Sequence, residues 1–279
     1  MKGLSILFAQ ETCLDARMRQ DAQRGGAQMS YARAMFTGLV EKTGEVIAFT
    51  PTEGAARLTI AAPGIVDRLH LGDSVAVCGV CLTALTIEHG AFPPRFSADL
   101  AAETIARTTL SRLVPGSLVN LELPTAAGSP LGGHVVQGHV DGTGTLLAVE
   151  PVAAGSQVDF SQSDWAKPDA MQTDSSQAAA GLTDWVIRVR LPQELMRYVV
   201  LKGSIAVEGI SLTVAGIEGA EIWIAILPHT YSATNLHTLA PGMEVNIEVD
   251  VMAKYAESRA QADASKRELT VESLLANGY

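Results

Sequence analysis

The 279-residue sequence has little cysteine, few aromatic side chains and no long apolar run. Its three cysteines, Cys13, Cys78 and Cys81, are too few for a disulfide-stabilised scaffold. No apolar segment reaches the roughly 20 residues that a membrane-spanning helix needs. The first 30 residues lack the pattern of a secretory signal. The sequence therefore predicts a cytoplasmic protein that does not enter a membrane.

Positive charge is also scarce, since 20 Lys and Arg residues stand against 30 Asp and Glu residues and give a net charge of −10. This balance argues against a nucleic acid or an anionic membrane as a partner. Hydrophobic residues make up 47% of the chain and charged residues 18%, which excludes a disordered chain and is enough for buried cores. The length is that of one large domain or two ordinary ones.

The most informative feature is an internal repeat. Three segments of the first half recur in the same order in the second half: Phe36–Val46 over Val136–Leu146, Leu71–Leu85 over Leu201–Ala215, and Glu103–Leu123 over His229–Val249. The numerical offset rises after the first segment, which places an insertion of about 30 residues between positions 146 and 201. The polar stretch Ser161–Asp184 is the candidate for this insertion.

Each half alternates apolar and polar residues and carries β-branched side chains, with turns marked by Gly and Pro. Short strands at this spacing favour a closed barrel, which leaves no exposed edges. The sequence predicts a mainly β fold, a tandem repeat of two six-stranded antiparallel Greek-key barrels plus a C-terminal α-helical segment. The predicted parts are an extension at 1–34 (disordered, or a misassigned start before Met35), a barrel at 35–133, a barrel at 134–250 with a loop inserted at about 161–184, and a helical oligomerisation segment at 251–279.

The repeat also interprets the C-x-x-C pair formed by Cys78 and Cys81. In the second half these positions hold Glu208 and Ser211, whereas a zinc or redox site needs both thiols. The sequence therefore predicts no metal site. Cys81 and Ser211 become equivalent small polar groups that face a bound heterocycle or polyol. The alternative for Cys81 is a buried small residue without a ligand.

Five strings together resemble the riboflavin synthase family, the alpha type with two lumazine-binding barrels: MFTGLVEKTGEV, SVAVCGVCLT, GGHVVQGHVDGTG, LKGSIAVEGISLTV and PGMEVNIEVDVMAKY. The resemblance runs from Met35 to about Tyr255. It implies a transferase that converts two 6,7-dimethyl-8-ribityllumazine molecules into riboflavin and 5-amino-6-(D-ribitylamino)uracil by four-carbon transfer, the last step of riboflavin biosynthesis. It also implies no metal or redox cofactor, one lumazine in each barrel, a homotrimer held partly by C-terminal helices, and association with lumazine synthase.

The resemblance further implies substrate-binding residues in both barrels. In the first barrel they are Gly38, Leu39, Val40, Cys81, Leu82, Thr83, Asp99, Leu100, Ala101, Ala102, Glu103 and Thr104. In the second barrel they are His139, Val140, Asp141, Lys202, Ser211, Leu212, Thr213, Ile226, Leu227, Pro228, His229, Thr230 and Tyr231. The candidate catalytic residues are Cys81, Ser211, His139 and Asp250.

Simpler interpretations stand beside several of these roles. His139 is alternatively a histidine on the barrel rim, Lys202 an exposed turn residue, and Asp250 a cap of the C-terminal helix. His134 matches the family at an active-site position, and strand periodicity places it on the side opposite His139, which argues against a metal site shared by the two histidines. The chain departs from the family at His229, where glutamate is frequent, and at Cys78, where asparagine is frequent, so Cys78 is interpreted as structural.

Two other functions compete with the enzyme. A lumazine or flavin carrier of the same fold tends to lose one of its two sites, whereas both halves here keep the Cys/Ser-x-Thr pattern and the equivalent Thr104 and Thr230. A flavin-dependent reductase with a barrel would bring a Gly-rich nucleotide-binding strand–turn–helix, and the sequence has none. The sequence leaves open which barrel binds the four-carbon donor and which groups act as acid and base.

Overall fold

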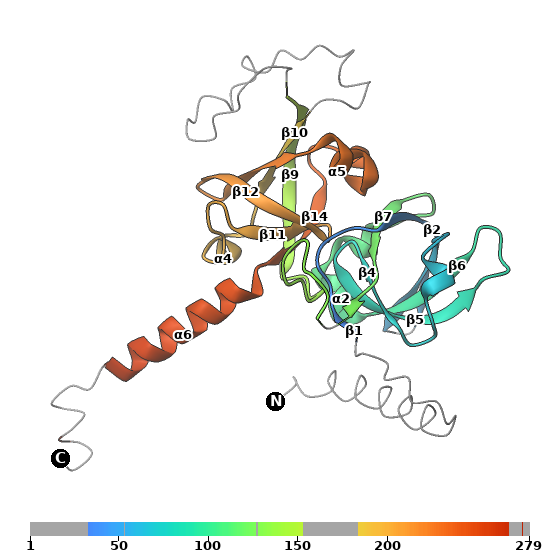
Figure 1. Ribbon diagram of the computed structural model, residues 1–279, viewed down its shortest axis with the longest axis horizontal. Coiled ribbons are helices and arrows are strands. Elements are labelled where there is room, and N and C mark those ends of the chain that lie inside the picture. Colours follow the sequence, from blue (N-terminus) through green and yellow to red (C-terminus); the bar gives the residue numbers. More distant parts are fainter. Residues whose placement is uncertain (1–32, 53, 127, 153–183, 268–274, 276–279) are drawn as a thin grey trace.

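The computed structural model describes residues 33–52, 54–126, 128–152, 184–267 and 275. These residues form two closed barrels that lie against each other, and a long helix leaves the second barrel (Figure 1). The predicted mainly β fold with two six-stranded antiparallel barrels and a C-terminal helix is thereby confirmed. The predictions for residues 1–32 and for nearly all of the insertion at 161–184 lie outside the described residues. The domain boundaries stay predictions.

The first barrel closes in the strand order β2-β3-β6-β5-β4-β7. Its strands are β2 (Lys42–Thr52), β3 (Ala55–Ala61), β4 (Ser74–Val77), β5 (Val80–Glu88), β6 (Arg95–Ala101) and β7 (Leu118–Glu122). Three short helical segments connect them, namely η1 (Val66–Arg68), α2 (Ala102–Arg107) and η2 (Thr109–Arg112). Because the chain passes from β3 to β4 while β3 pairs with β6, four of the strands form a Greek key.

The second barrel repeats this topology in the order β10-β13-β12-β11-β14-β9. Its strands are β9 (Gly142–Pro151), β10 (Trp185–Arg190), β11 (Ser204–Val207), β12 (Ile210–Glu218), β13 (Glu221–Ile226) and β14 (Glu244–Val249). The other elements are α4 (Gln193–Met196), α5 (Pro228–Ala233), η5 (Asn235–Thr238), the C-terminal helix α6 (Val251–Arg267), and a small ribbon of β1 (Arg33–Met35) with β8 (Thr125–Ala126).

The barrels meet at two equivalent hairpin turns. Cys78 and Gly79 connect β4 to β5 with φ values of 46° and 79°, and Glu208 and Gly209 connect β11 to β12 with φ values of 52° and 76°. Positive φ at both central positions is typical of the tight turns that match the twist of a hairpin. A Cβ atom on Gly79 would lie 2.8 Å from the Gly209 backbone nitrogen. Glycine at both positions therefore lets the two backbones touch.

Two equivalent asparagines connect the barrels on either side of these turns. Asn246 of β14 accepts a hydrogen bond from the Thr109 backbone N–H at 2.8 Å, and its amide donates to the Cys78 carbonyl at 3.0 Å. Asn120 of β7 makes the mirrored contacts, accepting from the Asn235 backbone N–H at 2.7 Å and donating to the Glu208 carbonyl at 2.9 Å. Each asparagine thus binds a turn and a helical start of the other barrel.

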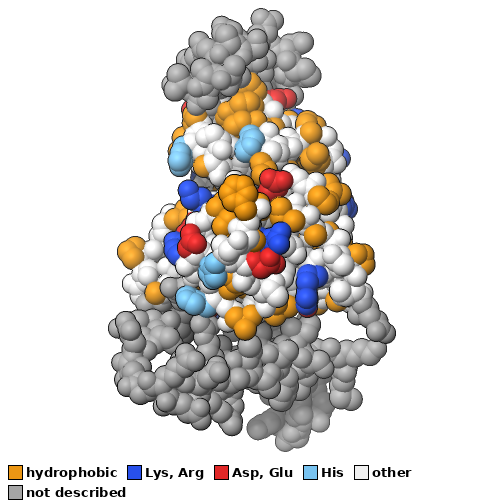
Figure 2. Space-filling view, turned by 90° about the vertical axis from the view of Figure 1, so that its right-hand side faces the viewer, with side chains coloured by type: hydrophobic (Ala, Val, Ile, Leu, Met, Phe, Trp, Pro, Cys, Tyr) orange, Lys and Arg blue, Asp and Glu red, His pale blue; other side chains and the backbone are white. Residues whose placement is uncertain are grey.

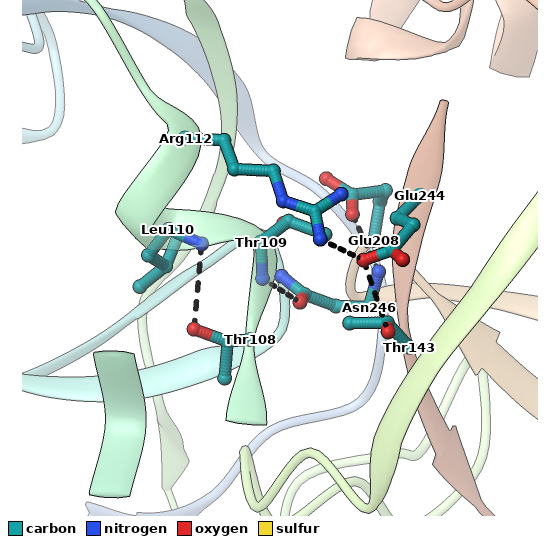
Figure 3. A network of polar contacts seen from close by, with 8 residues as sticks. All are labelled: Thr108, Thr109, Leu110, Arg112, Thr143, Glu208, Glu244 and Asn246. Carbon is teal, nitrogen blue, oxygen red and sulfur yellow. Dashed lines mark hydrogen bonds and ion pairs between the residues drawn. The ribbon is translucent and has the colours of Figure 1, made fainter. Parts of the chain in front are cut away.

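Glu208 lies inside this inter-barrel contact and is 4% exposed. Its carboxylate accepts from the Asn246 backbone N–H at 2.7 Å and from the Asn235 amide at 3.1 Å. Figure 3 shows Glu208, Asn246 and Thr109 in this network, with the Arg112–Glu244 ion pair beside them. Burial raises the pKa of Glu208, and burial together with the Glu208 charge raises the pKa of the Cys78 thiol well above its usual value. Cys78 is therefore a buried neutral thiol in the contact between the barrels.

Replacing Asn246 by alanine should lower the free energy of unfolding by about 2 kcal/mol, because the Thr109 N–H and the Cys78 carbonyl lose their partner in a buried contact. Urea denaturation of the purified variant measures the loss. Arg112→Ala is the matched control at the same contact. The Arg112 side chain, which pairs with Glu244, is 60% exposed. Loss of this ion pair should therefore lower the free energy of unfolding by less than about 1 kcal/mol. Equal costs for both variants would contradict the importance of the buried amide.

Candidate active site

Cys81 lies near the start of β5, opposite Ala76 of β4, and is partly buried. Burial raises the pKa of the Cys81 thiol, and the nearby Glu248 charge adds to the increase. The thiol is therefore neutral at physiological pH and suits hydrogen bonding better than nucleophilic attack. Thr83 shares its face of the strand because side chains alternate, whereas Leu82 points into the barrel core and is 5% exposed. Of this predicted trio, Cys81 and Thr83 can present a side chain to a ligand.

One loop segment of each repeat reaches the opposite barrel, and we call these two segments straps. The first strap, residues 37–40, precedes β2, and the second strap, residues 137–140, precedes β9. They start from a shared bridge between Phe36 and Val136. The Gly38 carbonyl then accepts a hydrogen bond from the Ser211 N–H at 2.7 Å, and the Gly138 carbonyl accepts one from the Cys81 N–H at 2.9 Å. The first strap therefore borders Ser211 of the second barrel, and the second strap borders Cys81 of the first.

This crossing corrects the sequence-based grouping. From the sequence, Gly38, Leu39 and Val40 are expected at the site of the first barrel, and His139 and Val140 at the site of the second. In the structure Val40 packs against the core of the second barrel and Val140 against the core of the first. The reason is that equivalent repeats exchange equivalent segments, and the sequence of a segment does not record which copy it packs against.

Both straps need glycine at their second position, because their backbones lie very close to Ser211 and Cys81. Gly38 and Gly138 have φ values of +74° and +79°, a region that favours glycine. A Cβ atom on Gly38 would lie 2.6 Å from Ser211 Cβ, and one on Gly138 would lie 2.6 Å from Cys81 Cβ. The straps therefore lie directly on the two equivalent polar residues.

The Ser211 site contains the imidazole of His134, which matches the family at an active-site position but is not among the predicted catalytic residues. His134 Nδ1 lies 2.7 Å from Ser211 Oγ, and the backbone N–H of His134 donates to the Thr37 carbonyl at 3.2 Å. His134 Nε2 is buried and has no hydrogen-bond partner among the described residues. Burial lowers the pKa of His134, against a smaller opposing effect of the Asp250 charge, so the ring is neutral at pH 7. A neutral ring with an unpartnered buried nitrogen can bind a ligand or take up a proton there.

Beside the family match, the glycine before His134 was a local signal for this residue. A Cβ atom on Gly133 would lie 2.1 Å from the Thr37 carbonyl oxygen and 3.0 Å from Ser211 Oγ. The glycine thus lets the loop reach Ser211 and place the next side chain on it. In the first repeat the corresponding position is Ala34, so the Cys81 site receives no equivalent imidazole. The two sites share a scaffold but differ in chemistry.

Asp141 and Asp250 both have structural partners. The Asp141 carboxylate accepts from the Val249 N–H at 2.9 Å and pairs with Lys254 at 2.7 Å, so it joins the second strap to β14 and α6. Asp250 accepts from the Met252 N–H at 2.8 Å as the cap of α6. Its proximity to His134 nevertheless gives its charge an electrostatic effect on that ring. His139 lies exposed on the second strap, beside the Cys81 site rather than the Ser211 site.

The segments expected to hold a ribityl chain differ between the barrels. In the first barrel Asp99 is paired with Arg57, which lowers the pKa of the Asp99 carboxyl, and Glu103 is paired with Arg107 on the exposed side of α2. Leu100 is fully buried in the core. The equivalent region of the second barrel, around α5, has an aromatic pair instead of these ion pairs. Tyr231 stacks on Trp185 with 3.8 Å between the ring centroids.

The remaining predicted residues of the second barrel lie around this aromatic pair and on the turn before β11. Ile226 is buried, whereas Leu227, just before α5, is 66% exposed. Lys202 is exposed in the turn before β11, with a φ of 64°. The structure therefore brings together Ser211, His134 and the first strap, and leaves Lys202 on the surface.

The described residues contain no group of three or more His, Cys, Asp or Glu side chains that could hold a metal ion. Among the same residues no helix is long and apolar enough to cross a membrane. Figure 2 shows one face of the molecule, where Lys and Arg side chains are interspersed with Asp, Glu and His. This face offers charges of both signs and no broad basic area.

Comparison with known proteins agrees with the two-site geometry. The lumazine binding domain family matches residues 37–124 and again residues 137–250. Relatives named riboflavin synthase include one from Mycobacterium tuberculosis, 44% identical over 227 residues, which cover 80% of this chain and 96% of the relative. One from Bacillus subtilis is 34% identical over 248 residues, which cover 88% of this chain and all of the relative.

Among solved structures, LumP complexed with riboflavin is similar with a TM-score of 0.61 at 23% identity, covering 77% of this chain and 99% of LumP. LumP complexed with 6,7-dimethyl-8-(1'-D-ribityl) lumazine is similar with a TM-score of 0.59 at 22% identity, with the same coverage. At this identity the likeness shows the shared fold. The domain match on both barrels and the level of identity to the bacterial relatives show that the chain belongs to the riboflavin synthase family.

Proposed function

We propose that the chain forms riboflavin from two molecules of 6,7-dimethyl-8-ribityllumazine, one bound beside Cys81 and one beside Ser211. The second product is 5-amino-6-(D-ribitylamino)uracil, and a four-carbon unit moves from one ring to the other. The observation that carries the proposal is the pair of equivalent sites, each made of a small polar residue on a barrel strand and a glycine strap from the other repeat. Two copies of one substrate need two related sites.

The two sites supply orientation as the main catalytic contribution. Holding both reactants in place replaces a bimolecular encounter by an effectively unimolecular step, which contributes on the order of 7–11 kcal/mol in favourable cases. The LumP structures support the ligand class, because that barrel fold binds both ribityl lumazine and riboflavin. The reaction moves carbon between two identical molecules and consumes no oxidant, so acid–base groups and fixed dipoles suffice for it.

His134 is the proposed general base. The 7-methyl group of the lumazine is acidic because its anion is delocalised into the ring. A neutral imidazole with a buried, unpartnered Nε2 can accept that proton. The hydrogen bond from Nδ1 to Ser211 fixes the orientation of the ring, and the Asp250 charge stabilises the imidazolium that forms. Cys81, as a neutral thiol, binds the partner molecule by hydrogen bonding.

The other predicted contacts keep their proposed roles. Thr83 and Thr213 follow the two polar residues on their strands, and His139 borders the Cys81 site from the second strap. Glu103 and Thr104 at α2, with His229 and Thr230 at α5, are proposed to bind the ribityl hydroxyls. In the bound state Glu103 would exchange its exposed ion pair with Arg107 for these hydroxyls.

A homotrimer is proposed as the working assembly, in the cytoplasm, with one barrel of each subunit facing the other barrel of a neighbour. Helix α6 supports this proposal because it extends away from the barrels (Figure 1) and exposes Met252 and Tyr255, each 64% exposed. Association with lumazine synthase, which would supply the substrate, stays a prediction. Light scattering after size exclusion measures the assembly, and a monomeric active enzyme would contradict it.

The decisive experiment mixes the purified chain with 6,7-dimethyl-8-ribityllumazine alone, without added metal or nicotinamide, and follows the absorbance of riboflavin. One pyrimidine diamine per riboflavin is expected. The alternative function is a lumazine or flavin carrier, which the likeness to the LumP complexes favours. Tight binding of lumazine without any turnover would replace the enzyme by the carrier.

A further inference from the structure

Two buried carboxylates lie where the straps leave their own barrels. Glu122 of β7 and Glu248 of β14 are 5% and 3% exposed. Glu122 accepts from the Thr37 N–H at 2.6 Å, the Thr37 hydroxyl at 2.8 Å and the Gly38 N–H at 3.0 Å. Glu248 accepts from the Gln137 N–H at 2.7 Å and the Gly138 N–H at 3.0 Å. Each carboxylate thus binds two successive backbone amides of one strap.

The strap glycines connect these carboxylates to the opposite barrel. The Gly38 N–H is bound by Glu122 of the first barrel, while the Gly38 carbonyl binds Ser211 of the second. The Gly138 N–H is bound by Glu248 of the second barrel, while the Gly138 carbonyl binds Cys81 of the first. In both cases one residue spans the two contacts. The position of each ligand-facing strand residue therefore depends on a carboxylate in the other barrel.

We propose that Glu122 and Glu248 are positioning residues that act crosswise, Glu122 on the Ser211 site of the second barrel and Glu248 on the Cys81 site of the first. Neither carboxylate needs to touch a ligand for this role. The inference about ligand binding rests on the proposed two-site function, whereas the inference about the straps stands on the hydrogen bonds alone. It implies that substituting the carboxylate of one barrel changes the position of the strap at the site of the other barrel.

The isosteric variants Glu122→Gln and Glu248→Gln test the crosswise action. An amide has one acceptor oxygen and turns N–H donors toward one of the strap amides, so the strap should detach. Hydrogen–deuterium exchange of the full-length protein at pH 8, where Glu248 is ionised, and without ligand, reports the Cys81 and Ser211 amides in separate peptides. Glu248→Gln should speed exchange around Cys81 by on the order of tenfold and leave Ser211 unchanged. Glu122→Gln should do the reverse.

Two further variants keep the test decisive if a glutamine variant does not fold. Thr37→Val removes one of the three donors to Glu122 and should speed exchange at Ser211 but not at Cys81. Glu248→Asp keeps the charge but shortens its reach, and should affect Cys81 alone. The exposed Glu218→Gln serves as the matched control and should change neither. Equal acceleration at both sites, or acceleration in the carboxylate's own barrel, would overturn the proposal.

Riboflavin titration then separates this inference from the proposed function. With wild-type protein, calorimetry should resolve two classes of site. Each glutamine variant should weaken one class by on the order of tenfold and leave the other, and the class that weakens should differ between the two variants. If wild type binds riboflavin but forms none from lumazine, the enzyme proposal fails while the crosswise positioning stands. If the exchange pattern is not crosswise, the positioning fails whatever the enzyme does.

Discussion

Replacing His134 by glutamine should lower kcat for riboflavin formation by about 10²–10⁴-fold, the usual contribution of a positioned general base. The structure supports a loss of this size because His134 is the imidazole that contacts Ser211, and its Nε2 is buried without a partner among the described residues. Glutamine keeps the size and can still bind Ser211, but it cannot accept the proton. Steady-state kinetics with purified protein measures the effect, and KM should change much less than kcat.

His139→Gln is the matched control, because His139 is the histidine among the catalytic residues predicted from the sequence. His139 is exposed beside the Cys81 site, so its loss should weaken substrate binding more than it slows the reaction. The pH profile gives a second readout. Since burial lowers the pKa of His134 from 6.5, wild-type activity should fall only below pH 6.5, and this acidic limb should vanish in His134→Gln. A variant at 134 that keeps wild-type kcat, or a larger loss at 139, would return the role to His139.

The fold could be predicted because its signals are local and occur twice. Alternation and turn glycines such as Gly79 and Gly209 act within a few residues, and the repeat confirms each of them independently. The crossing of the straps could not be predicted in the same way. Gly38 and Gly138 occupy equivalent positions of the repeat, and only the packing of the two barrels decides that each lies on a strand of the opposite barrel.

The contact of His134 with Ser211 could not be predicted from the sequence for a related reason. Strand periodicity would apply to His134 and His139 only if both lay on one strand, whereas the segment between them contributes only a single bridge residue, Val136. The chain there is a loop whose course is fixed by the contact of Gly133 with Thr37. The equivalence of Cys81 with Ser211, by contrast, followed from the repeat alone, since both lie two residues after the turn glycine of a β-hairpin.

Stability should fall as pH rises from about 4.5 to 7, and Glu248→Gln should remove this fall. Burial raises the pKa of Glu248 from 4.5 to about 7, because the cost of desolvation exceeds the favourable effects of the strap amides and of Lys254. Asp141 on the second strap adds a further unfavourable charge, and the Cys81 thiol on β5 lies close enough to respond to the carboxylate. Between these pH values the native protein keeps a proton that the unfolded chain has released.

The unfolded state therefore binds fewer protons over this window, and the free energy of unfolding decreases with increasing pH, by about 3 kcal/mol in total for a shift of this size. Below pH 4.5 both states are protonated and above pH 7 both are ionised, so the contribution is constant outside the window.

Urea denaturation of wild type and Glu248→Gln at half-unit steps from pH 4.5 to 8 measures the difference between them, in which the opposite contribution of His134 cancels. Glu122→Gln is the matched comparison, because burial also raises the pKa of the Glu122 carboxyl, whereas this carboxyl is held by three donors rather than two. A wild-type-minus-variant difference that stays flat, or that rises with pH, would show that Glu248 is ionised in the folded protein throughout, and that the second strap is held by a full carboxylate charge at every pH in this range.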